Sequence, residues 1–390
     1  MSKSGAIFVA DVGRGELLRF PASGDSATVI GRPGGGPGEF ASMFRIGRFA
    51  DDSILVYDGR LSRLSVFSDS AFVRSTSIST APGASPFALA PVGLLPNGRL
   101  LMATGATALL RYPGPARVER ETISLHAYSR DGKHERSLGT FEGQEYEVLM
   151  MRSGPLAGEA FSRRPRTFGR GTAILVSGDH IVVADNDAWR IDFLDGEGAL
   201  TRSVRFAQPA VAVTQKDVEA FWEERLAGTT VPAARNALRA IMADVNVPEL
   251  FPAFDANVLV SQNGDIWIGD FVRPGTATQR WRILKPDGTL RGQLTRPAKF
   301  RLLDAGERYV LALVRDEDGV ETIELHELET ATEPVSYQGA CGRGTAVRRP
   351  RTGRARVGMR AACTAAFLAP PPISLLRFCK SLCRNLLCVA

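Results

Sequence analysis

The sequence predicts an all-β protein, a six-bladed β-propeller with a helical insertion between blades 4 and 5 and a disordered C-terminal tail. Three observations support this fold class. A hairpin of two apolar runs recurs along the chain, its copies are spaced as propeller blades are, and the tail differs sharply from the rest in composition. We expect one propeller domain over residues 1–335 and a basic, cysteine-containing tail over residues 336–390.

The clearest copy of the hairpin, from Ile54 to Phe67, reads ILVYDGRLSRLSVF. An apolar run ending in Asp, a polar turn and a second apolar run are typical of an antiparallel hairpin. The interval from the Asp to the last apolar residue is 9 in three copies, which are Asp11 to Phe20, Asp58 to Phe67 and Asp185 to Leu194. Six hairpins are expected, near residues 7–20, 54–67, 99–128, 181–194, 266–284 and 309–328.

The spacing of the hairpins identifies the repeat. Their starts are separated by 47, 45, 82, 85 and 43 residues. Propeller repeats need roughly 40 to 50 residues for one four-stranded blade. Three gaps therefore correspond to one blade each, and the two long gaps to one blade with an insertion.

The hairpins supply the two middle strands of each blade, and we expect an inner strand before each hairpin and an outer strand after it. Strand candidates are found for five inner and five outer positions, so blade 1 lacks an inner strand and blade 6 an outer one. An unpaired edge inside the ring is costly, because buried backbone groups need hydrogen bonds. We therefore hypothesise that the chain begins inside blade 1 and that a natural upstream segment is absent.

Two connections, residues 140–171 and 207–256, are too long for turns. The second contains a predicted helical pair over residues 214–243, in which Thr214 is the N-cap and Gly228 ends the first helix. Both connections join an outer strand to the next inner strand, so they share one face of the propeller with the hairpin turns. Insertions gathered on one face are typical of the binding face of a repeat protein.

Charge and cysteine content separate the tail from the body. The formal net charge is +6, but residues 337–390 contain nine Arg, one Lys and no acidic residue, which leaves the body at about −4. All five cysteines also lie in the tail. The abrupt change is typical of a segment translated in a shifted frame, and the alternative is a cationic amphipathic helix from Ile373 that lies on a membrane.

Several function classes are excluded by these patterns. The basic charge is confined to the tail, so we expect no nucleic acid partner. The N-terminus has no apolar signal-peptide core, and no run of 18 apolar residues could span a membrane.

The order of the motifs resembles a known family. The IVVAD-type strands, GRPGGGPGEF, YDGRLSRLSVF, VPELFPAFD before NGDIWIGD, and RDEDGVETIELHEL together resemble bacterial six-bladed β-propellers related to NHL-repeat propellers. The resemblance covers about residues 5–330. It implies an exported, periplasmic or cell-surface protein, although this chain shows no signal peptide.

The aspartates at the hairpin turns have two interpretations. Asp11, Asp58, Asp185 and Asp270 could converge on a metal ion at the central channel, as in gluconolactonase-like propellers. Their recurrence in every clear blade instead favours turn-capping residues that pair with arginines across the turn, Asp58 with Arg63, Asp185 with Arg190 and Asp270 with Arg280. We nominate no metal ligand, no catalytic residue and no cofactor.

The glycine-rich stretch from Gly31 to Phe40 also has two interpretations. It suggests a phosphate-binding loop, but it lacks the GK[ST] ending and no helix pattern follows it. A connection between blades in which several residues need positive φ angles is the simpler interpretation.

An arginine cluster in the first insertion is the candidate ligand site. Charge-assisted hydrogen bonds from such a cluster could hold an anionic ligand on the insertion face. Glutamates of the same segment, Glu142, Glu145, Glu147 and Glu159, could instead neutralise it. The proposed ligand-binding residues are Arg152, Arg163, Arg164 and Arg166, with Arg170 nearby.

These patterns favour a non-enzymatic binding or interaction module of the NHL-like propeller type, a monomer with an unknown protein or small-molecule ligand on the insertion-bearing face. The alternative is a metal-dependent hydrolase or lactonase with its site at the mouth of the central channel. Whether the chain is an enzyme is left open, with a binding module favoured.

Overall fold

The computed structural model describes most of the chain up to residue 328 and two short segments beyond it. The described residues are 1–2, 4–24, 26–48, 53–82, 89–105, 117–151, 160–229, 231–243, 245–315, 321–328, 359–360 and 387–389. Within them, no helix has both the length and the apolar character that crossing a bilayer requires.

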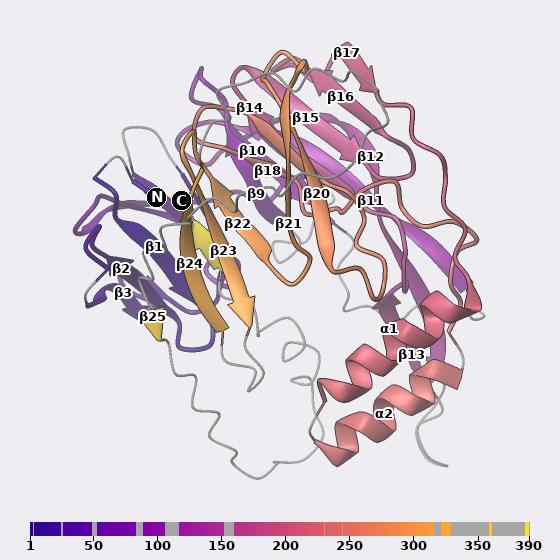
Figure 1. Ribbon diagram of the computed structural model, residues 1–390. Coiled ribbons are helices and arrows are strands. Elements are labelled where there is room, and N and C mark those ends of the chain that lie inside the picture. The colour runs from indigo at the N-terminus through magenta and orange to yellow at the C-terminus, as the bar shows by residue number, and fades with distance from the viewer. Residues whose placement is uncertain are drawn as a thin grey trace, which may run out of the picture.

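The strands form six small sheets, which we number as blades 1 to 6 in chain order (Figure 1). Blade 1 contains β1 (Ile7–Asp11), β2 (Glu16–Phe20), β3 (Thr28–Pro33), β4 (Glu39–Phe40) and β26 (Leu387–Val389). Blade 2 contains β5 (Met43–Arg48), β6 (Ile54–Asp58), β7 (Arg63–Phe67) and β8 (Phe72–Ser77). Blade 3 contains β9 (Leu89–Leu94), β10 (Leu100–Thr104), β11 (Arg117–Tyr128), β12 (His134–Met151) and β13 (Ala160–Pro165).

The second half of the chain repeats the four-stranded pattern. Blade 4 contains β14 (Thr172–Ser177), β15 (His180–Asp185), β16 (Arg190–Leu194) and β17 (Leu200–Arg205). Blade 5 contains β18 (Leu259–Val260), β19 (Ile266–Gly269), β20 (Thr278–Leu284) and β21 (Leu290–Pro297). Blade 6 contains β22 (Arg301–Ala305), β23 (Tyr309–Arg315), β24 (Glu321–Glu327) and β25 (Met359–Arg360).

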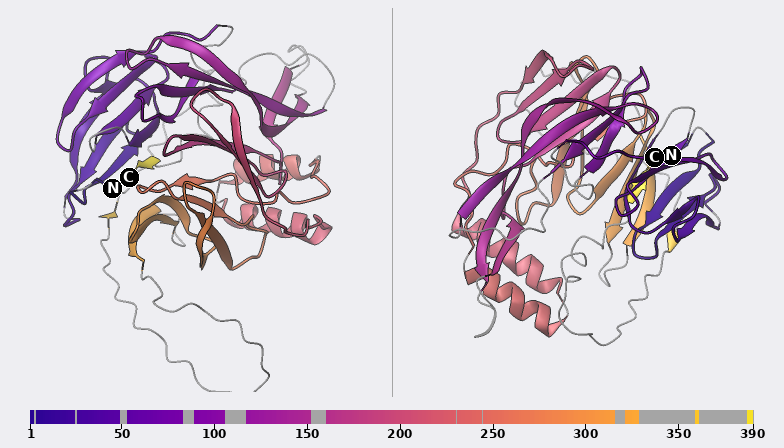
Figure 2. Two further views of the ribbon diagram at one scale, coloured as in Figure 1. Left: turned by 90° about the horizontal axis from the view of Figure 1, so that it is seen from above. Right: turned by 180° about the vertical axis from the view of Figure 1, so that it is seen from behind.

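The innermost strands lie around a common centre (Figure 2). Each contacts the next in the order β26, β5, β9, β14, β18 and β22, and β22 contacts β26 again. Neighbouring strands are antiparallel throughout, apart from the short parallel pair of β3 and β4. This mostly β arrangement of six sheets is consistent with a six-bladed propeller, the fold class that the sequence predicts.

Six apolar clusters fill the spaces between neighbouring blades. Successive side chains of a strand point to opposite faces of its sheet. In β1, Phe8 and Ala10 therefore pack toward blade 2, whereas Ile7 and Val9 pack toward blade 6. Because both faces of each blade are covered, the strand after the inner one is apolar at nearly every position, which is why the hairpins read as continuous apolar runs rather than alternating ones.

The helical insertion between blades 4 and 5 is confirmed as two helices, α1 (Gln215–Ala227) and α2 (Pro232–Ala243). Thr214 is the N-cap of α1: its side chain accepts a hydrogen bond from the Asp217 backbone N–H, and the Asp217 carboxylate accepts one from the Thr214 backbone. This reciprocal capping box fixes where the helix begins. Gly228 follows the last turn, as expected from the sequence.

The tail contributes strands where the sequence predicts disorder. β25 is the fourth strand of blade 6 and pairs with β24, and β26 pairs with β1 through Phe8 and Val389, Val9 and Cys388, and Ala10 and Leu387. These two segments therefore occupy the outer and inner positions for which the sequence offered no strand. The other tail residues lie outside the described part of the chain, and disorder of the tail stays a prediction.

Two histidines between blades 2 and 3 predict a pH dependence of stability. The His126 side chain is buried, with its Nδ1 3.3 Å from His134 Nε2 and 3.1 Å from Ser137 Oγ. Burial, and then the neighbouring His134, lower the pKa of His126. The unfolded chain, in which a histidine titrates near about 6.5, therefore binds this proton more readily than the folded one, so stability should be complete above about pH 6.5 and fall as the pH falls below it.

Urea unfolding at pH 7.5 and pH 5.5 would measure this effect as a lower transition midpoint at pH 5.5. His126→Phe, which cannot be protonated, should show a smaller difference between the two midpoints. An equal difference in both proteins would assign the pH dependence to other groups.

Candidate functional site

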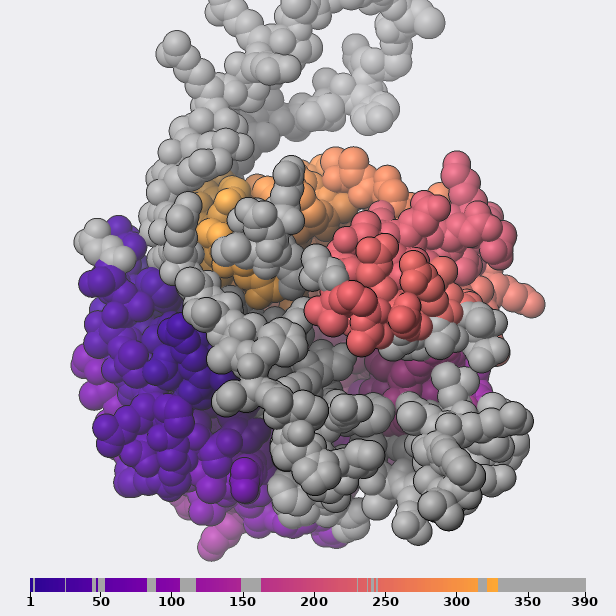
Figure 3. All heavy atoms as spheres, turned by 90° about the horizontal axis from the view of Figure 1, so that it is seen from below, coloured from indigo at the N-terminus to yellow at the C-terminus, as the bar shows by residue number. Residues whose placement is uncertain are grey.

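The connections that carry the insertions gather on one face of the molecule. Figure 3 looks onto this face from below, where the helical insertion lies on the side of blades 4 and 5. The same face carries the turns that follow β1, β6, β15 and β19, because these turns and the connections between blades leave the sheets on the same side. We call it the insertion face.

An extension of blade 3 forms the first insertion. β11 and β12 continue past the blade, and β13 adds a third strand to them, with Arg117 opposite Val148 and Tyr146 opposite Pro165. We call residues 117–121, 143–151 and 160–165 the arm. The sequence predicts only a connection too long for a turn over residues 140–171, and it indicates neither the length of β12 nor the presence of β13.

Two of the predicted ligand-binding arginines lie on β13. Arg163 donates through Nε to Glu119 at 3.0 Å, and its guanidinium carbon lies 3.5 Å from the centre of the Tyr146 ring. Its side chain is only 2% exposed, whereas that of Arg164 is 18% exposed. Arg164 donates to Glu147 at 2.6 Å, so both guanidinium groups meet carboxylates of the arm itself.

Arg166, the third predicted residue, connects the arm to the helical insertion. Its Nη1 donates to Glu145 at 3.3 Å, while Nε and Nη2 donate to the backbone and side-chain oxygens of Asn246 at 3.0 and 2.8 Å. The Asn246 backbone N–H in turn donates to Glu147 at 3.0 Å. The fourth predicted residue, Arg152, lies outside the described residues.

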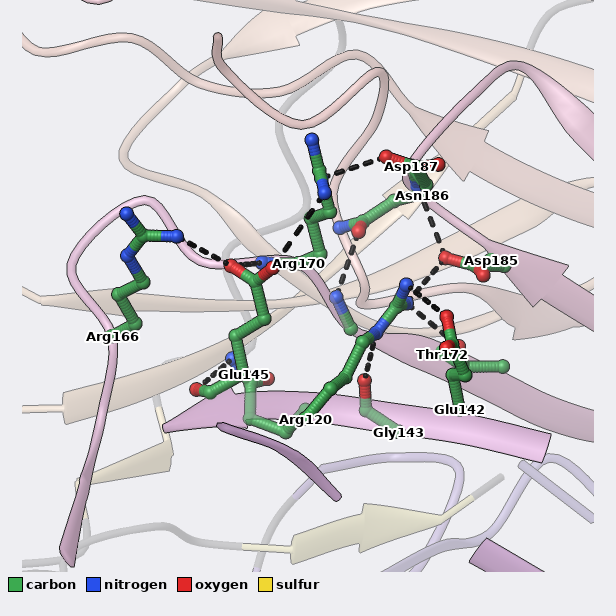
Figure 4. Close-up of polar contacts among 12 residues, drawn as sticks. Arg120, Glu142, Gly143, Glu145, Arg166, Arg170, Thr172, Asp185, Asn186 and Asp187 are labelled. Carbon is green, nitrogen blue, oxygen red and sulfur yellow. Dashed lines mark hydrogen bonds and ion pairs between the residues drawn. The ribbon is translucent and has the colours of Figure 1, made fainter. Parts of the chain in front are cut away.

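A second group of contacts ties the arm to blade 4 (Figure 4). Arg120 donates to Asp185 at 2.6 Å, to Glu142 at 2.8 Å and to the Gly143 carbonyl at 3.0 Å. Arg170 lies 2.7 Å from Asp187 and 3.7 Å from Glu145. The guanidinium groups thus bridge two blades, because each can donate in several directions within one plane.

Arginines and carboxylates of the arm, its connecting loop and blade 4 form one network of ion pairs. Six arginines face six carboxylates, which are Arg117, Arg120, Arg163, Arg164, Arg166 and Arg170 with Glu119, Glu142, Glu145, Glu147, Asp185 and Asp187. Glu145 and Glu147 are buried, so the glutamates do more than compensate charge in solvent. A buried carboxylate needs its arginine partners, because an unpaired buried charge is costly. Glu145 and Glu147 therefore hold the segments that carry their arginines in place.

The turn aspartates are engaged locally. Asp58 is fully buried and accepts four backbone N–H groups, and Asp11 accepts the Arg14 N–H at 3.0 Å. Asp270 pairs with Arg280, as the sequence suggests. The other two expected pairs are replaced, because Arg63 donates to loop carbonyls and Arg190 pairs with Asp192. In the described part of the chain, no group of three or more His, Cys, Asp or Glu side chains is placed to hold a metal ion.

The glycine-rich loop is filled by the protein's own side chains. Arg63 donates to the carbonyls of Gly35, Gly36 and Glu39, and the Glu39 carboxylate accepts the Gly36 N–H at 2.9 Å. Gly38 has a φ of +73°, and Gly34 leaves no space for a Cβ beside Glu39. These contacts support the connection between blades rather than a phosphate loop.

The contacts that sequence reasoning missed are those between distant segments. Arg166 and Asn246 are 80 residues apart, and Arg120 and Asp185 are 65 apart. The acidic and basic residues of the arm are visible in the sequence, but nothing local marks Asn246 as their partner.

Comparisons with known proteins bear on the fold alone. No protein-family model matches the chain, and no curated protein matches it in sequence. Six-bladed propellers are similar in structure at low identity. Virginiamycin B lyase from Staphylococcus aureus is 10% identical over 80% of this chain and 89% of that chain, with a TM-score of 0.36. A member of the DUF4221 family from Bacteroides vulgatus is 11% identical over 80% and 86%, with a TM-score of 0.36. Nidogen in its complex with laminin is 14% identical over 53% and 77%, with a TM-score of 0.27.

Proposed function

We propose that this chain is a non-enzymatic binding module of the NHL-like propeller type whose ligand meets the insertion face. One observation carries the proposal: Asn246, from the helical insertion, makes three hydrogen bonds to Arg166 and Glu147 of the arm and its connecting loop. Two insertions from different parts of the chain are thereby joined into one surface. Insertions held together on a rigid scaffold are a common form of binding site.

Arg164 and Arg166 are the proposed ligand contacts. Their side chains are 18% and 15% exposed, so each reaches the surface while a carboxylate holds it in position. Since both guanidinium groups already bind carboxylates, we expect the ligand to present acidic groups that take over part of this coordination. Arg163 is buried beneath Tyr146, so we assign it a supporting role.

The alternative, a metal-dependent hydrolase at the channel mouth, receives less support. Its metal site would use the turn aspartates, yet the described contacts of Asp11, Asp58, Asp185 and Asp270 serve turns and arginines. A carboxylate whose lone pairs are used in this way must give up those bonds before it can bind a hard cation.

The test combines partner capture with cross-linking. The full chain, immobilised, would be incubated with an extract of its source cells, and cross-links to captured proteins would be mapped by mass spectrometry. Cross-links are expected on the arm, α1 and α2. Arg164→Gln with Arg166→Gln should weaken capture about tenfold or more, because a hydrogen bond to a charged group contributes about 1.5 to 3 kcal/mol.

Arg74→Gln with Arg202→Gln provides the matched control, because these exposed arginines lie on the outer strands of blades 2 and 4. This control pair should capture partners as the unmodified chain does. Cross-links confined to the opposite face, or equal losses in both pairs, would refute the proposal.

A further inference from the structure

The helical insertion is closed at its base. The Val213 N–H donates to the Glu249 carbonyl and the Phe251 N–H to the Val211 carbonyl, both at 2.9 Å, on either side of a bridge between Ala212 and Leu250. The segment between these paired residues therefore leaves and rejoins the propeller at one place. A segment closed in this way can move as one body about its base.

Beyond this base, the insertion has little core of its own. Trp222 and Asp217 are the buried residues of α1, and every residue of α2 whose exposure is described is exposed or half-buried. Its described polar links to blade 5 lie near the surface, such as the Gly275 N–H to Glu224 at 3.1 Å and Arg273 3.8 Å from Asp217. Regions with few buried contacts open at a lower free energy than the core does.

The ring of Phe168, which lies outside the helical insertion, supplies an apolar contact that the insertion lacks on its own. Phe168, in the loop after the arm, lies 5.1 Å from the ring of Phe221 on α1, 4.9 Å from Phe251 and 6.2 Å from Phe271, all edge to face. It is only 7% exposed. Its φ of +57° is the left-handed conformation, which is unfavourable for a residue with a side chain and persists only where the surroundings stabilise it.

We propose that the helical insertion is a lid that opens as a unit about its base, and that Phe168 is the latch that holds it closed. Withdrawal of the Phe168 ring removes the main apolar contact between α1 and the loop after the arm, and it also relieves the backbone of that loop. The links of Glu224 and Asp217 to blade 5 lie near the surface and contribute little, so opening must then break chiefly the hydrogen bonds of Asn246 to Arg166 and Glu147.

Opening also changes the chemistry of the arm. Arg166 loses both oxygen atoms of Asn246, so its Nε and Nη2 groups become free to donate to a carboxylate of a ligand. This consequence rests on the proposed function. The lid itself does not, because its opening can be measured without any ligand.

Hydrogen exchange of the full chain, read by mass spectrometry under native conditions, tests the lid. Phe168→Ala removes the ring, and Phe168→Gly also removes the backbone restriction. Both should raise exchange in α1 at least tenfold while the strands of blades 4 and 5 exchange as before. Phe168→Leu keeps part of the buried surface, so it should raise exchange by a smaller factor and remains informative if the smaller residues prevent folding.

Phe72→Ala is the matched control, because Phe72 makes a similar edge-to-face contact, 5.7 Å from Phe67 in blade 2. It should raise exchange in blades 1 and 2 and leave α1 unchanged. The lid would be refuted if α1 exchanged no faster in the Phe168 variants, or if exchange rose equally in α1 and in the strands of blades 4 and 5.

Discussion

Replacement of Asp58 by alanine is expected to destabilise the protein by about 3 to 5 kcal/mol, one of the two largest effects that we predict for a single residue. The fully buried carboxylate accepts the N–H groups of Ala41 at 2.6 Å, Ser42 at 3.0 Å, Arg60 at 3.0 Å and Leu61 at 2.9 Å. The first two belong to the connection before β5 and the last two to the hairpin turn after β6. Without Asp58, four donors lose their acceptor and two segments lose their connection.

Urea unfolding followed by circular dichroism would measure the loss. The stability of Asp58→Asn should lie between those of the unmodified protein and Asp58→Ala. Its amide oxygen can replace one carboxylate oxygen, whereas its NH₂ group faces backbone donors and cannot accept from them. Asp69→Ala is the control, since Asp69 is 40% exposed and pairs with Arg19 at the surface. A loss below about 1 kcal/mol in Asp58→Ala would mean that water replaces the carboxylate at little cost.

The second large effect is expected for Trp281→Ala, at about 3 to 5 kcal/mol. The indole is 1% exposed and packs with Trp267, Leu302 and Val310 in the apolar cluster between blades 5 and 6. Its removal leaves a cavity that neighbouring strands, held by their hydrogen bonds, fill only in part. Equilibrium unfolding should therefore show a lower midpoint with an unchanged slope.

Two further substitutions show whether the loss of stability comes from the buried indole ring or from any substitution in blade 5. Trp281 Nε1 has no hydrogen-bond partner among the described residues, so Trp281→Phe loses only part of the apolar contact and should cost roughly half as much. Leu290→Ala in the same blade removes a side chain that is 46% exposed and should change stability by less than about 0.5 kcal/mol. Similar losses in all three variants would contradict the cluster as the source of stability.

The sequence predicts the blades well because each repeat is marked by residues that are close together along the chain. Strands such as Ile54–Asp58 and Ile181–Asp185 are apolar at successive positions, and a polar turn follows each at a fixed interval. Thr214 and Gly228 mark α1 in the same local way. Such signals depend only on neighbours along the chain.

Contacts between distant segments could not be predicted in this way. Arg63 follows Asp58 by five residues, yet its guanidinium reaches the carbonyls of the glycine-rich loop. Nothing near Asn246 indicates that Arg166 and Glu147 bind it. The length of β12 escaped prediction because its outer half pairs with β13 and forms ion pairs with it, and the hairpin repeat indicates neither contact.

The apolar cluster between blades 6 and 1 has a consequence for the synthesis of the protein. It brings Ile7 and Val9 against Leu311 and Leu313, which are made some 300 residues later. Until that part of the chain has left the ribosome, one face of blade 1 has no partner and exposes apolar side chains to water or to a chaperone. Non-local contacts of this kind form late and slow folding. Blade 1 is thus completed only after the strands of blade 6 have been made, and until then its uncovered apolar face can associate with other chains.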